Sequence, residues 1–191
     1  MTRDDFWITM VTLSKMSGDG RWLAFYNCGE FSGARCSSSS SWVMCSQQHK
    51  HVQFIPLPPR EEFNPFPDIL HEQNVQSNKQ LPFQHYVASL PHGSTPEACL
   101  DAYNNLLTTL REHNPQRKLS YNFAMTTDWI FVAPREKDDY QHEGYKIGVN
   151  STGMVGLLLS KSDDETAFIE KVGPFAVLEY VGCPWPSNNT S

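Results

Sequence analysis

Two neighbouring apolar segments constrain the fold more than any other feature of this sequence. Residues 119–125 and 129–133 are rich in the aromatic and aliphatic side chains that strands favour, and only Thr126-Thr127-Asp128 separates them. Two strands joined this closely form a hairpin, in which they run antiparallel. The sequence therefore predicts an antiparallel sheet that includes residues 119–133.

Three further segments are predicted as strands. Residues 21–27 are dense in aromatic side chains, residues 51–55 are strand-like up to a proline-rich stop at 56–59, and residues 81–89 follow a similar pattern. The polar and proline-rich stretch 60–84 predicts a long surface loop.

Helices are predicted in two places. Residues 94–97 read Ser-Thr-Pro-Glu, which suits a helix start, and apolar side chains then recur at helical spacing up to residue 113. Residues 150–159 predict a turn that leads into an apolar segment, and a last helix begins at 163–165 and breaks at 173–174. Because strands and helices do not alternate and no repeat is found, we predict an α+β fold with an antiparallel sheet.

Length and composition narrow the class of protein. The chain has 191 residues, 39% of them hydrophobic and 12% aromatic, which fits one globular domain. A formal net charge of -6 argues against broad nucleic-acid binding, and no apolar run is long enough to span a membrane. The five cysteines are irregularly spaced and form no Cys-x-x-Cys, so neither a disulfide framework nor a zinc site is indicated. We expect a reduced protein of the cytoplasm, or of the cytoplasm and the nucleus.

The motif His49-Lys50-His51-Val52-Gln53 can carry chemistry. Alternate side chains of a strand share a face, so His49, His51 and Gln53 point the same way. A partly unprotonated imidazole can attack phosphorus, which divides one difficult transfer into two easier ones. On these residues alone two other interpretations stay open: histidines that only pack or face solvent, and a histidine pair that shares a metal ion.

A set of motifs, in one order along the chain, resembles the fungal-type diadenosine tetraphosphate phosphorylases, also called ATP adenylyltransferases. The similar segments are Asn27-Cys28-Gly29, Ser32-Gly33-Ala34, 46–53, Pro56-Leu57-Pro58, 120–129, 132–135, 148–153 and 172–174. This family is a branch of the histidine-triad superfamily and is related to galactose-1-phosphate uridylyltransferase. The resemblance covers residues 22–182 and implies a histidine-triad-like antiparallel sheet with flanking helices.

The resemblance also implies a mechanism. His51 matches the nucleophile, which attacks an adenylyl phosphorus, forms a covalent AMP-histidine and releases ATP; inorganic phosphate then takes the AMP and yields ADP. His49 matches the residue that orients His51. Gln53 stands where hydrolases of the superfamily carry a third histidine. Its amide can donate a hydrogen bond but cannot act as an acid or base, which favours transfer to phosphate over hydrolysis.

Further residues are implied to bind the substrate. They are Asn27, Gly33, Ala34, Ser46 and Gln47 before the histidines, and Asn150, Ser151, Thr152, Leu157 and Lys161 in the C-terminal half. Small residues in the first group let backbone N–H groups approach an anion, and Lys161 adds positive charge. Simple turn chemistry is the alternative for Asn27 and Gly33, and a solvated charge is the alternative for Lys161.

The implied partners are a dinucleoside polyphosphate, ATP, ADP and phosphate, without nucleic acid or membrane, and the oligomeric state is left open. No metal site and no protein-bound cofactor is implied. A divalent metal such as Mg²⁺ can accompany the nucleotide substrate.

The chain departs from the family pattern in two places. A serine-rich insertion at 35–45 separates Ala34 from Ser46, which are adjacent in the family. Residues 1–21 form a poorly matched lead, so the sheet is expected to be incomplete on its N-terminal side, and residues 183–191 form a tail. These departures make an inactive or weakly nucleotide-binding family member the alternative to an active phosphorylase. A hydrolase or uridylyltransferase relative is a further alternative, against which Gln53 and residues 150–152 argue.

Overall fold

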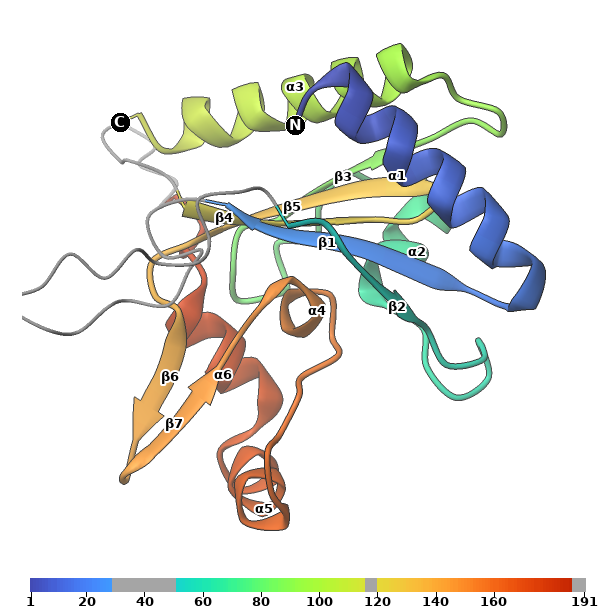
Figure 1. The fold of residues 1–191 in the computed structure, drawn as a ribbon. Helices are drawn as coiled ribbons and strands as arrows, with labels where there is room; N and C mark the ends of the chain where they lie inside the picture. The colour runs from blue at the N-terminus through green and yellow to red at the C-terminus, as the bar shows by residue number, and fades with distance from the viewer. Residues whose placement is uncertain (29–50, 116–119, 187–191) are drawn as a thin grey trace, which may run out of the picture.

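The computed structural model describes residues 1–28, 51–115 and 120–186 and contains a five-stranded sheet with helices on both faces (Figure 1). The strands are β1 (Trp22–Cys28), β2 (Gln53–Pro56), β3 (Tyr86–Ser89), β4 (Ser120–Met125) and β5 (Trp129–Arg135). Their spatial order is β2-β1-β4-β5-β3, and every neighbouring pair is antiparallel. The predicted α+β class is confirmed.

The predicted hairpin is the centre of the sheet. Met125 pairs with Ile130 beside the turn, and Ser120 pairs with Arg135 at the far end of β4 and β5. The backbone N–H of Thr126 donates to the carbonyl of Trp129 over 3.1 Å, which closes the turn. Residues 120–125 and 129–135 are buried along their whole length, because both faces of the sheet are covered.

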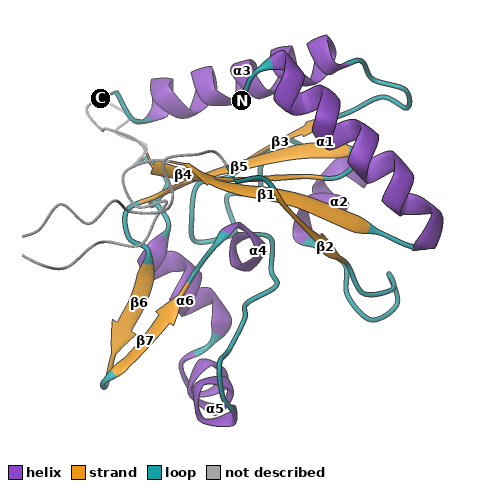
Figure 2. Ribbon diagram, in the orientation of Figure 1, coloured by secondary structure: helices purple, strands orange, loops and turns teal. Residues whose placement is uncertain are grey.

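Helices α1 (Arg3–Met16) and α3 (Pro96–His113) cover one face of the sheet (Figure 2). A short 3₁₀ turn, η1 (Ser17–Asp19), links α1 to β1. Thr95, within the helix start predicted at 94–97, caps α3, since its hydroxyl accepts from the backbone N–H of Ala98 over 3.2 Å. The buried side chains of this layer include Phe6, Leu13, Tyr103, Leu110, Phe123 and Ile130.

The other face of the sheet carries α2 (Phe66–Glu72), α4 (Ser151–Met154), α5 (Asp163–Val172) and α6 (Pro174–Val181) (Figure 1). A small separate hairpin, β6 (Asp139–His142) and β7 (Tyr145–Gly148), lies beside α6. The buried side chains of this layer include Leu23, Phe25, Phe131, Met154, Phe168 and Val177. Alternate residues of β1 thus serve two separate cores, which fixes the direction in which every side chain of the strand points.

Four elements differ from the sequence-based expectations. The long loop expected at 60–84 is wrong in part, because α2 forms inside it. Helix α1, the β6–β7 hairpin and α6 were not predicted at all. Helix α1 has a local signal that was missed: the Thr2 hydroxyl accepts from the N–H of Asp5, and the Asp5 carboxylate accepts from the N–H of Thr2 over 2.6 Å, a capping box.

A buried ion pair holds α2 against the sheet. Asp68 is 3% exposed, and its carboxylate accepts from the Arg21 guanidinium and from the Trp129 indole, the latter over 2.6 Å. Arg21 also donates to the carbonyl of Phe63 over 3.0 Å. This side-chain network explains why a polar, proline-rich stretch is ordered: Asp68 has one partner, Arg21, just before β1 and a buried partner, Trp129, in β5.

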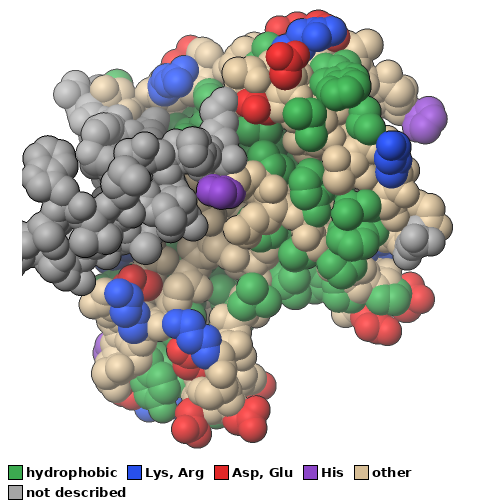
Figure 3. Space-filling model, viewed as in Figure 1, with side chains coloured by type: hydrophobic (Ala, Val, Ile, Leu, Met, Phe, Trp, Pro, Cys, Tyr) green, Lys and Arg blue, Asp and Glu red, His purple; other side chains and the backbone are tan. Residues whose placement is uncertain are grey.

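Part of the outer surface of α1 is apolar. Trp7, Ile8 and Val11 are 55%, 55% and 37% exposed. Figure 3 shows hydrophobic side chains gathered along α1 and the adjoining edge of the sheet. In the described parts of the chain, no helix combines the length and apolar character needed to cross a bilayer.

Candidate functional site

The register of β2 on β1 places the histidine motif. Gln53, the first residue of β2, pairs with Phe25, and His51 lies two residues before this strand. Gln53 shares the face of Phe25, which lies in the core beneath α4 to α6, whereas Val52 packs against the core on the α1 side. His51 and Gln53 are therefore on the α4 side of the sheet, and both are exposed.

Asn27, near the end of β1, is the centre of a hydrogen-bond network on that face. Its side-chain oxygen accepts from the backbone N–H of Ser151 over 3.0 Å and from the Asn122 amide over 2.7 Å. Asn122 lies opposite Asn27 on β4 and is completely buried. The network joins β1 and β4 to the first residue of α4.

The Ser151 hydroxyl completes this network. It accepts from the second hydrogen of the Asn122 amide over 3.1 Å and lies 3.0 Å from the carbonyl oxygen of Tyr26, to which it can donate. It also lies 2.8 Å from the Asn27 oxygen, which already has two donors. Ser151 is fully buried, so the hydrogen bonds that hold it are shielded from water.

These contacts determine how both amides are oriented. A backbone N–H can only donate, so the Asn27 atom that meets Ser151 must be its oxygen. The Asn122 atom that meets this oxygen must then be its nitrogen. The amide nitrogen of Asn27, which makes no hydrogen bond to any described residue, is left facing away from the network.

Asn150 shapes the start of α4. Its side-chain oxygen accepts from the backbone N–H groups of Thr152 and Gly153 over 3.0 and 3.1 Å, so Asn150 is the helix cap. Thr152 is fully buried and its hydroxyl donates to the same Asn150 oxygen. In the structure, residues 150–152 thus form hydrogen bonds with other residues of this chain. These hydrogen bonds position α4 against Asn27.

Leu157 and Lys161 lie on the segment between α4 and α5. The backbone N–H of Leu157 donates to the carbonyl of Thr152 over 2.9 Å, which holds this segment close to α4. The Lys161 backbone N–H donates to the Glu165 carboxylate over 2.7 Å. The Lys161 side chain is exposed, and its ammonium pairs with none of the described acidic residues.

Some predicted residues lie outside the described parts of the chain. These are His49, Gly33, Ala34, Ser46, Gln47 and the insertion at 35–45. Their placement stays a prediction. Within the described ranges, no three His, Cys, Asp or Glu side chains come together in a way that could hold a metal ion.

Two polar residues on this face were not singled out by sequence reasoning. Asn122 interrupts a run of apolar side chains in β4, and Arg135 ends the apolar strand β5. A polar residue within a buried strand is the signal that could have identified both. Burial lowers the pKa of the Arg135 guanidinium, an effect that the Asp138 carboxylate opposes from 3.2 Å.

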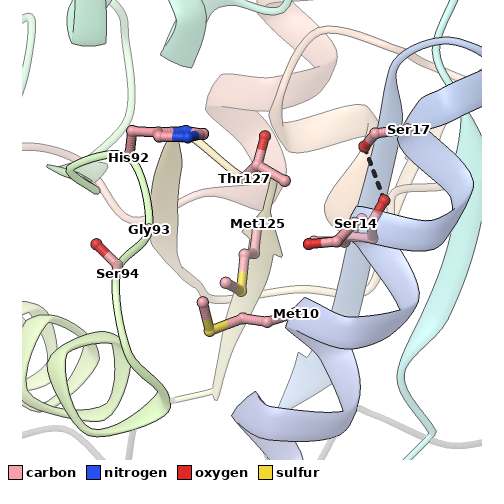
Figure 4. Close-up of a pocket in the computed structure, with 9 residues that line it drawn as sticks. Met10, Ser14, Ser17, His92, Gly93, Ser94, Met125 and Thr127 are labelled. Atoms are coloured by element: carbon pink, nitrogen blue, oxygen red, sulfur yellow. Dashed lines mark hydrogen bonds between the residues drawn. The ribbon is translucent and has the colours of Figure 1, made fainter.

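A cavity of about 350 Å³ lies elsewhere, between α1 and the residues before α3 (Figure 4). It is lined by Met10, Leu13, Ser14, Ser17, His92, Gly93, Ser94, Met125 and Thr127. Met125 belongs to the core on the α1 side of the sheet. The cavity is therefore on the opposite face from His51 and Asn27 and is not part of their site.

Two family descriptions match the chain. The pattern of the ATP adenylyltransferase C-terminal domain matches residues 79–184, and that of the Ap4A phosphorylase N-terminal domain matches residues 1–72. The second range starts at the first residue and includes α1 and β1. Residues 1–72 and residues 79–184 thus each match a domain of known proteins.

Curated relatives come from Saccharomyces cerevisiae. Protein APA1 is 31% identical over 176 residues, which cover 81% of this chain and 50% of that protein. Diadenosine 5',5'''-P1,P4-tetraphosphate phosphorylase 2 is 29% identical over 195 residues, which cover 86% of this chain and 55% of that protein. The chain therefore spans about half the length of these relatives.

Solved structures of similar proteins point to the same family. The crystal structure of yeast Ap4A phosphorylase Apa2 in complex with AMP superimposes with a TM-score of 0.81 at 26% identity, over 100% of this chain and 65% of that one. The complex of the same enzyme with Ap4A gives a TM-score of 0.77 at 26% identity, over 96% and 64% of the two chains. Sequence patterns in both halves and one shared fold lead to a single conclusion: this chain belongs to the family of the ATP adenylyltransferases and Ap4A phosphorylases.

Proposed function

We propose that the protein catalyses phosphorolysis of diadenosine tetraphosphate to ATP and ADP, and the reverse adenylyl transfer, through a covalent AMP on His51. The observation that carries this proposal is the placement of the motif. His51 lies two residues before β2, whose first residue, Gln53, pairs with Phe25. Asn27 lies two residues after Phe25 and binds the start of α4, and the fold is that of an enzyme whose structures contain AMP and Ap4A.

The reaction proceeds in two displacements. A ring nitrogen of His51 attacks the phosphorus of an adenylyl group, a P–N bond forms, and the bond to the remaining chain of three phosphates breaks, so that ATP leaves. An oxygen of inorganic phosphate then attacks the same phosphorus, the P–N bond breaks and ADP leaves. An exposed imidazole just before the edge strand β2 suits this role, because the phosphorus must be approached from an open side.

Gln53 and Asn27 serve as neutral donors beside the nucleophile. Gln53 shares the exposed face of His51, and its amide can donate to phosphoryl oxygens without exchanging a proton. The Asn27 amide nitrogen is free of described partners and can donate to the same group. Lys161 adds a positive charge for the polyphosphate, since its exposed ammonium has no acidic partner among the described residues.

Trapping the intermediate tests the proposal. The protein is incubated with diadenosine tetraphosphate labelled in its adenosine, without phosphate, and quenched in alkali, since the expected phosphoramidate is labile in acid. Peptide mapping should find AMP on His51, and added phosphate should release the label as ADP. His51→Ala should give no adduct and no turnover, while His49→Ala should keep part of the activity because it acts only by orienting its neighbour.

Two results would contradict the proposal. One is a wild-type protein that cleaves the substrate without any histidine adduct. The other is a His51→Ala variant with full activity. His92→Ala is a matched control, because His92 is an exposed histidine that lines the cavity on the opposite face of the sheet; that variant should form the adduct at the wild-type rate.

A further inference from the structure

Arg135 is a buried charge that is only partly satisfied. The residue is 5% exposed. One terminal nitrogen of its guanidinium, Nη1, meets the Asp138 carboxylate at 3.2 Å, while Nε and the second terminal nitrogen, Nη2, have no hydrogen-bond partner among the described residues. A buried charged group that lacks partners is destabilising, so these two nitrogens need an explanation.

The two unpartnered nitrogens form one edge of the guanidinium. Nε–H and Nη2–H lie side by side and point in parallel, which is the arrangement that holds two oxygens of a carboxylate or phosphate at once. The occupied nitrogen belongs to the opposite side of the group. Arg135 therefore keeps its orientation through Asp138 and presents a complete two-donor edge to something else.

The sheet register places this edge on the face that carries the site. Asn122 pairs with Ala133, and Arg135 is two residues further along β5, so the side chains of Asn122 and Arg135 share a face. Such diagonal neighbours are about 7–8 Å apart in a sheet, within the reach of an arginine. Tyr121 pairs both with Cys28, the residue after Asn27, and with Pro134, the residue before Arg135. Arg135 thus lies at the Asn27 end of the sheet.

A second buried atom marks the same region. Among the described residues, the side-chain oxygen of Asn122 has no hydrogen-bond partner, whereas both hydrogens of its nitrogen are donated, to Asn27 and Ser151. Two buried polar groups on one face, at one end of the sheet, are thus left without partners. Both groups lie beside the network that positions α4, and neither has a role in holding that network together.

We propose that the Nε–Nη2 edge of Arg135 binds two oxygens of a phosphoryl group in the site. This inference rests on the proposed function, which brings phosphoryl groups to the neighbouring His51 and Asn27. Two ligands can supply this phosphoryl group: the inorganic phosphate that accepts AMP, and the polyphosphate of the dinucleotide. The charge-assisted pair would form away from water, where such bonds are strongest, and it would bring one fixed positive charge to a chain whose net charge is -6.

Titration of the unmodified protein tests binding directly. The arginine Nε–H resonances are followed by ¹H–¹⁵N NMR during separate additions of inorganic phosphate, AMP and ATP, with the Arg135 signal assigned through its own backbone. The Arg135 Nε–H signal should move with at least one of these ligands. A static Arg135 signal, in a sample where the His51 ring signals respond to nucleotide, overturns the inference and leaves the proposed function intact. No response at either residue overturns both.

Substitution then separates the two sources of the phosphoryl group. Arg135→Lys keeps the charge but loses the two-donor edge, and the loss should be about 10- to 100-fold. If inorganic phosphate is bound, KM for phosphate rises by this factor while the AMP adduct on His51 forms at the wild-type rate. If the polyphosphate is bound, adduct formation slows instead. The control is Arg60→Lys, an arginine with an exposed partner, Glu72, at 2.9 Å; neither constant should change.

A purely structural role predicts a different pattern. Arg135→Lys would then melt at a lower temperature, but the increase in melting temperature produced by saturating nucleotide or phosphate would equal that of the wild type. Unchanged kinetic constants together with an unchanged ligand-induced increase overturn the inference. Should this variant fail to fold, the titration of the unmodified protein decides the question alone.

Discussion

Ser151, the first residue of α4, donates its backbone N–H to the side-chain oxygen of Asn27 on β1 over 3.0 Å, although 124 residues separate the two. The contact gives each atom of the Asn27 amide a separate task. The oxygen holds α4 and Asn122 in place, and in the proposed function the nitrogen, which has no partner among the described residues, donates to the ligand. A residue that resembles a substrate contact in sequence is therefore also a structural joint between two halves of the fold.

Replacement of Asn27 by Asp should separate these tasks. A carboxylate can still accept from Ser151 and Asn122, so the free energy of unfolding should change by no more than about 1 kcal/mol. The nitrogen becomes a negative oxygen that repels phosphate, and nucleotide affinity should fall by more than about tenfold. Isothermal titration with AMP measures the affinity.

Asn27→Ala, in contrast, should lower stability by about 1–3 kcal/mol because buried donors lose their acceptor. An Asn27→Asp protein that binds AMP normally would show that the amide nitrogen does not face the nucleotide.

Replacement of Gln53 by His should change the product. The imidazole can take a proton from water, whereas the amide cannot, so hydrolysis should compete with phosphorolysis. With phosphate present, the ratio of ADP to AMP among the products should decrease relative to the wild type. Gln53→Asn is a useful comparison, since it changes the side chain but keeps an amide and adds no base. The same ADP to AMP ratio in an active Gln53→His enzyme would contradict the role assigned to Gln53.

Removal of the Asp68 carboxylate should destabilise the fold. Asp68→Ala leaves the Arg21 guanidinium and the buried Trp129 indole without their acceptor, which should cost about 3–5 kcal/mol in urea unfolding. The matched control is Glu72→Ala on the same helix, whose exposed pair with Arg60 should contribute no more than about 1 kcal/mol. Equal effects of the two substitutions would mean that α2 is not anchored through Asp68.

His85 should make stability depend on pH. It is fully buried against the rings of Phe66, Phe83 and Trp185, and burial lowers the pKa of its imidazole from 6.5 to about 4. Between these values the unfolded chain binds a proton that the folded chain does not. Stability should therefore decrease as the pH falls from about 6.5 to about 4, by about 3 kcal/mol in total, and this contribution should be absent above pH 6.5.

The comparison of His85→Gln with the wild type tests this effect. A glutamine can replace both ring contacts, the bond donated to the Phe83 carbonyl at 2.9 Å and the bond accepted from the Asn78 N–H at 3.0 Å. Its stability between pH 4 and 6.5 should lack the His85 component, as the difference between the two unfolding curves will show. His92→Gln, at an exposed position, should retain the wild-type pH dependence.

Elements with a local signal were predicted well. The β4–β5 hairpin and α3 follow from a three-residue connection, a capping threonine and apolar spacing, all of which act between near neighbours in sequence. Helix α5 begins and ends where its acidic first turn and Gly173 predict, and Gly173 has a φ of 89°, which glycine adopts most readily. Helix α1 had such a signal as well, in its capping box.

Elements without a local signal could not be predicted in the same way. Helix α2 lies in a polar, proline-rich stretch and is ordered because Asp68 reaches Arg21, just before β1, and Trp129 in β5. The β6–β7 hairpin gains its burial from packing against α5 and α6, where the ring of Tyr145 stacks on that of Phe168 with 4.1 Å between centroids. Contacts of this kind join residues that are distant in sequence, so no window of neighbouring residues contains them.

The sequence by itself determined the family, the fold class and the identity of His51 and Gln53 as candidates. These follow from short motifs and strand patterns, each of which lies within a run of neighbouring residues. Only the tertiary structure decided that the Asn27 oxygen is occupied by Ser151 and Asn122, and that Arg135 turns an unpartnered edge toward the same face. Strand order and register bring these residues together, and both depend on burying two separate cores at once. Two groups form a hydrogen bond only when they lie close together in space. Groups that are distant in sequence come that close only when the chain has folded.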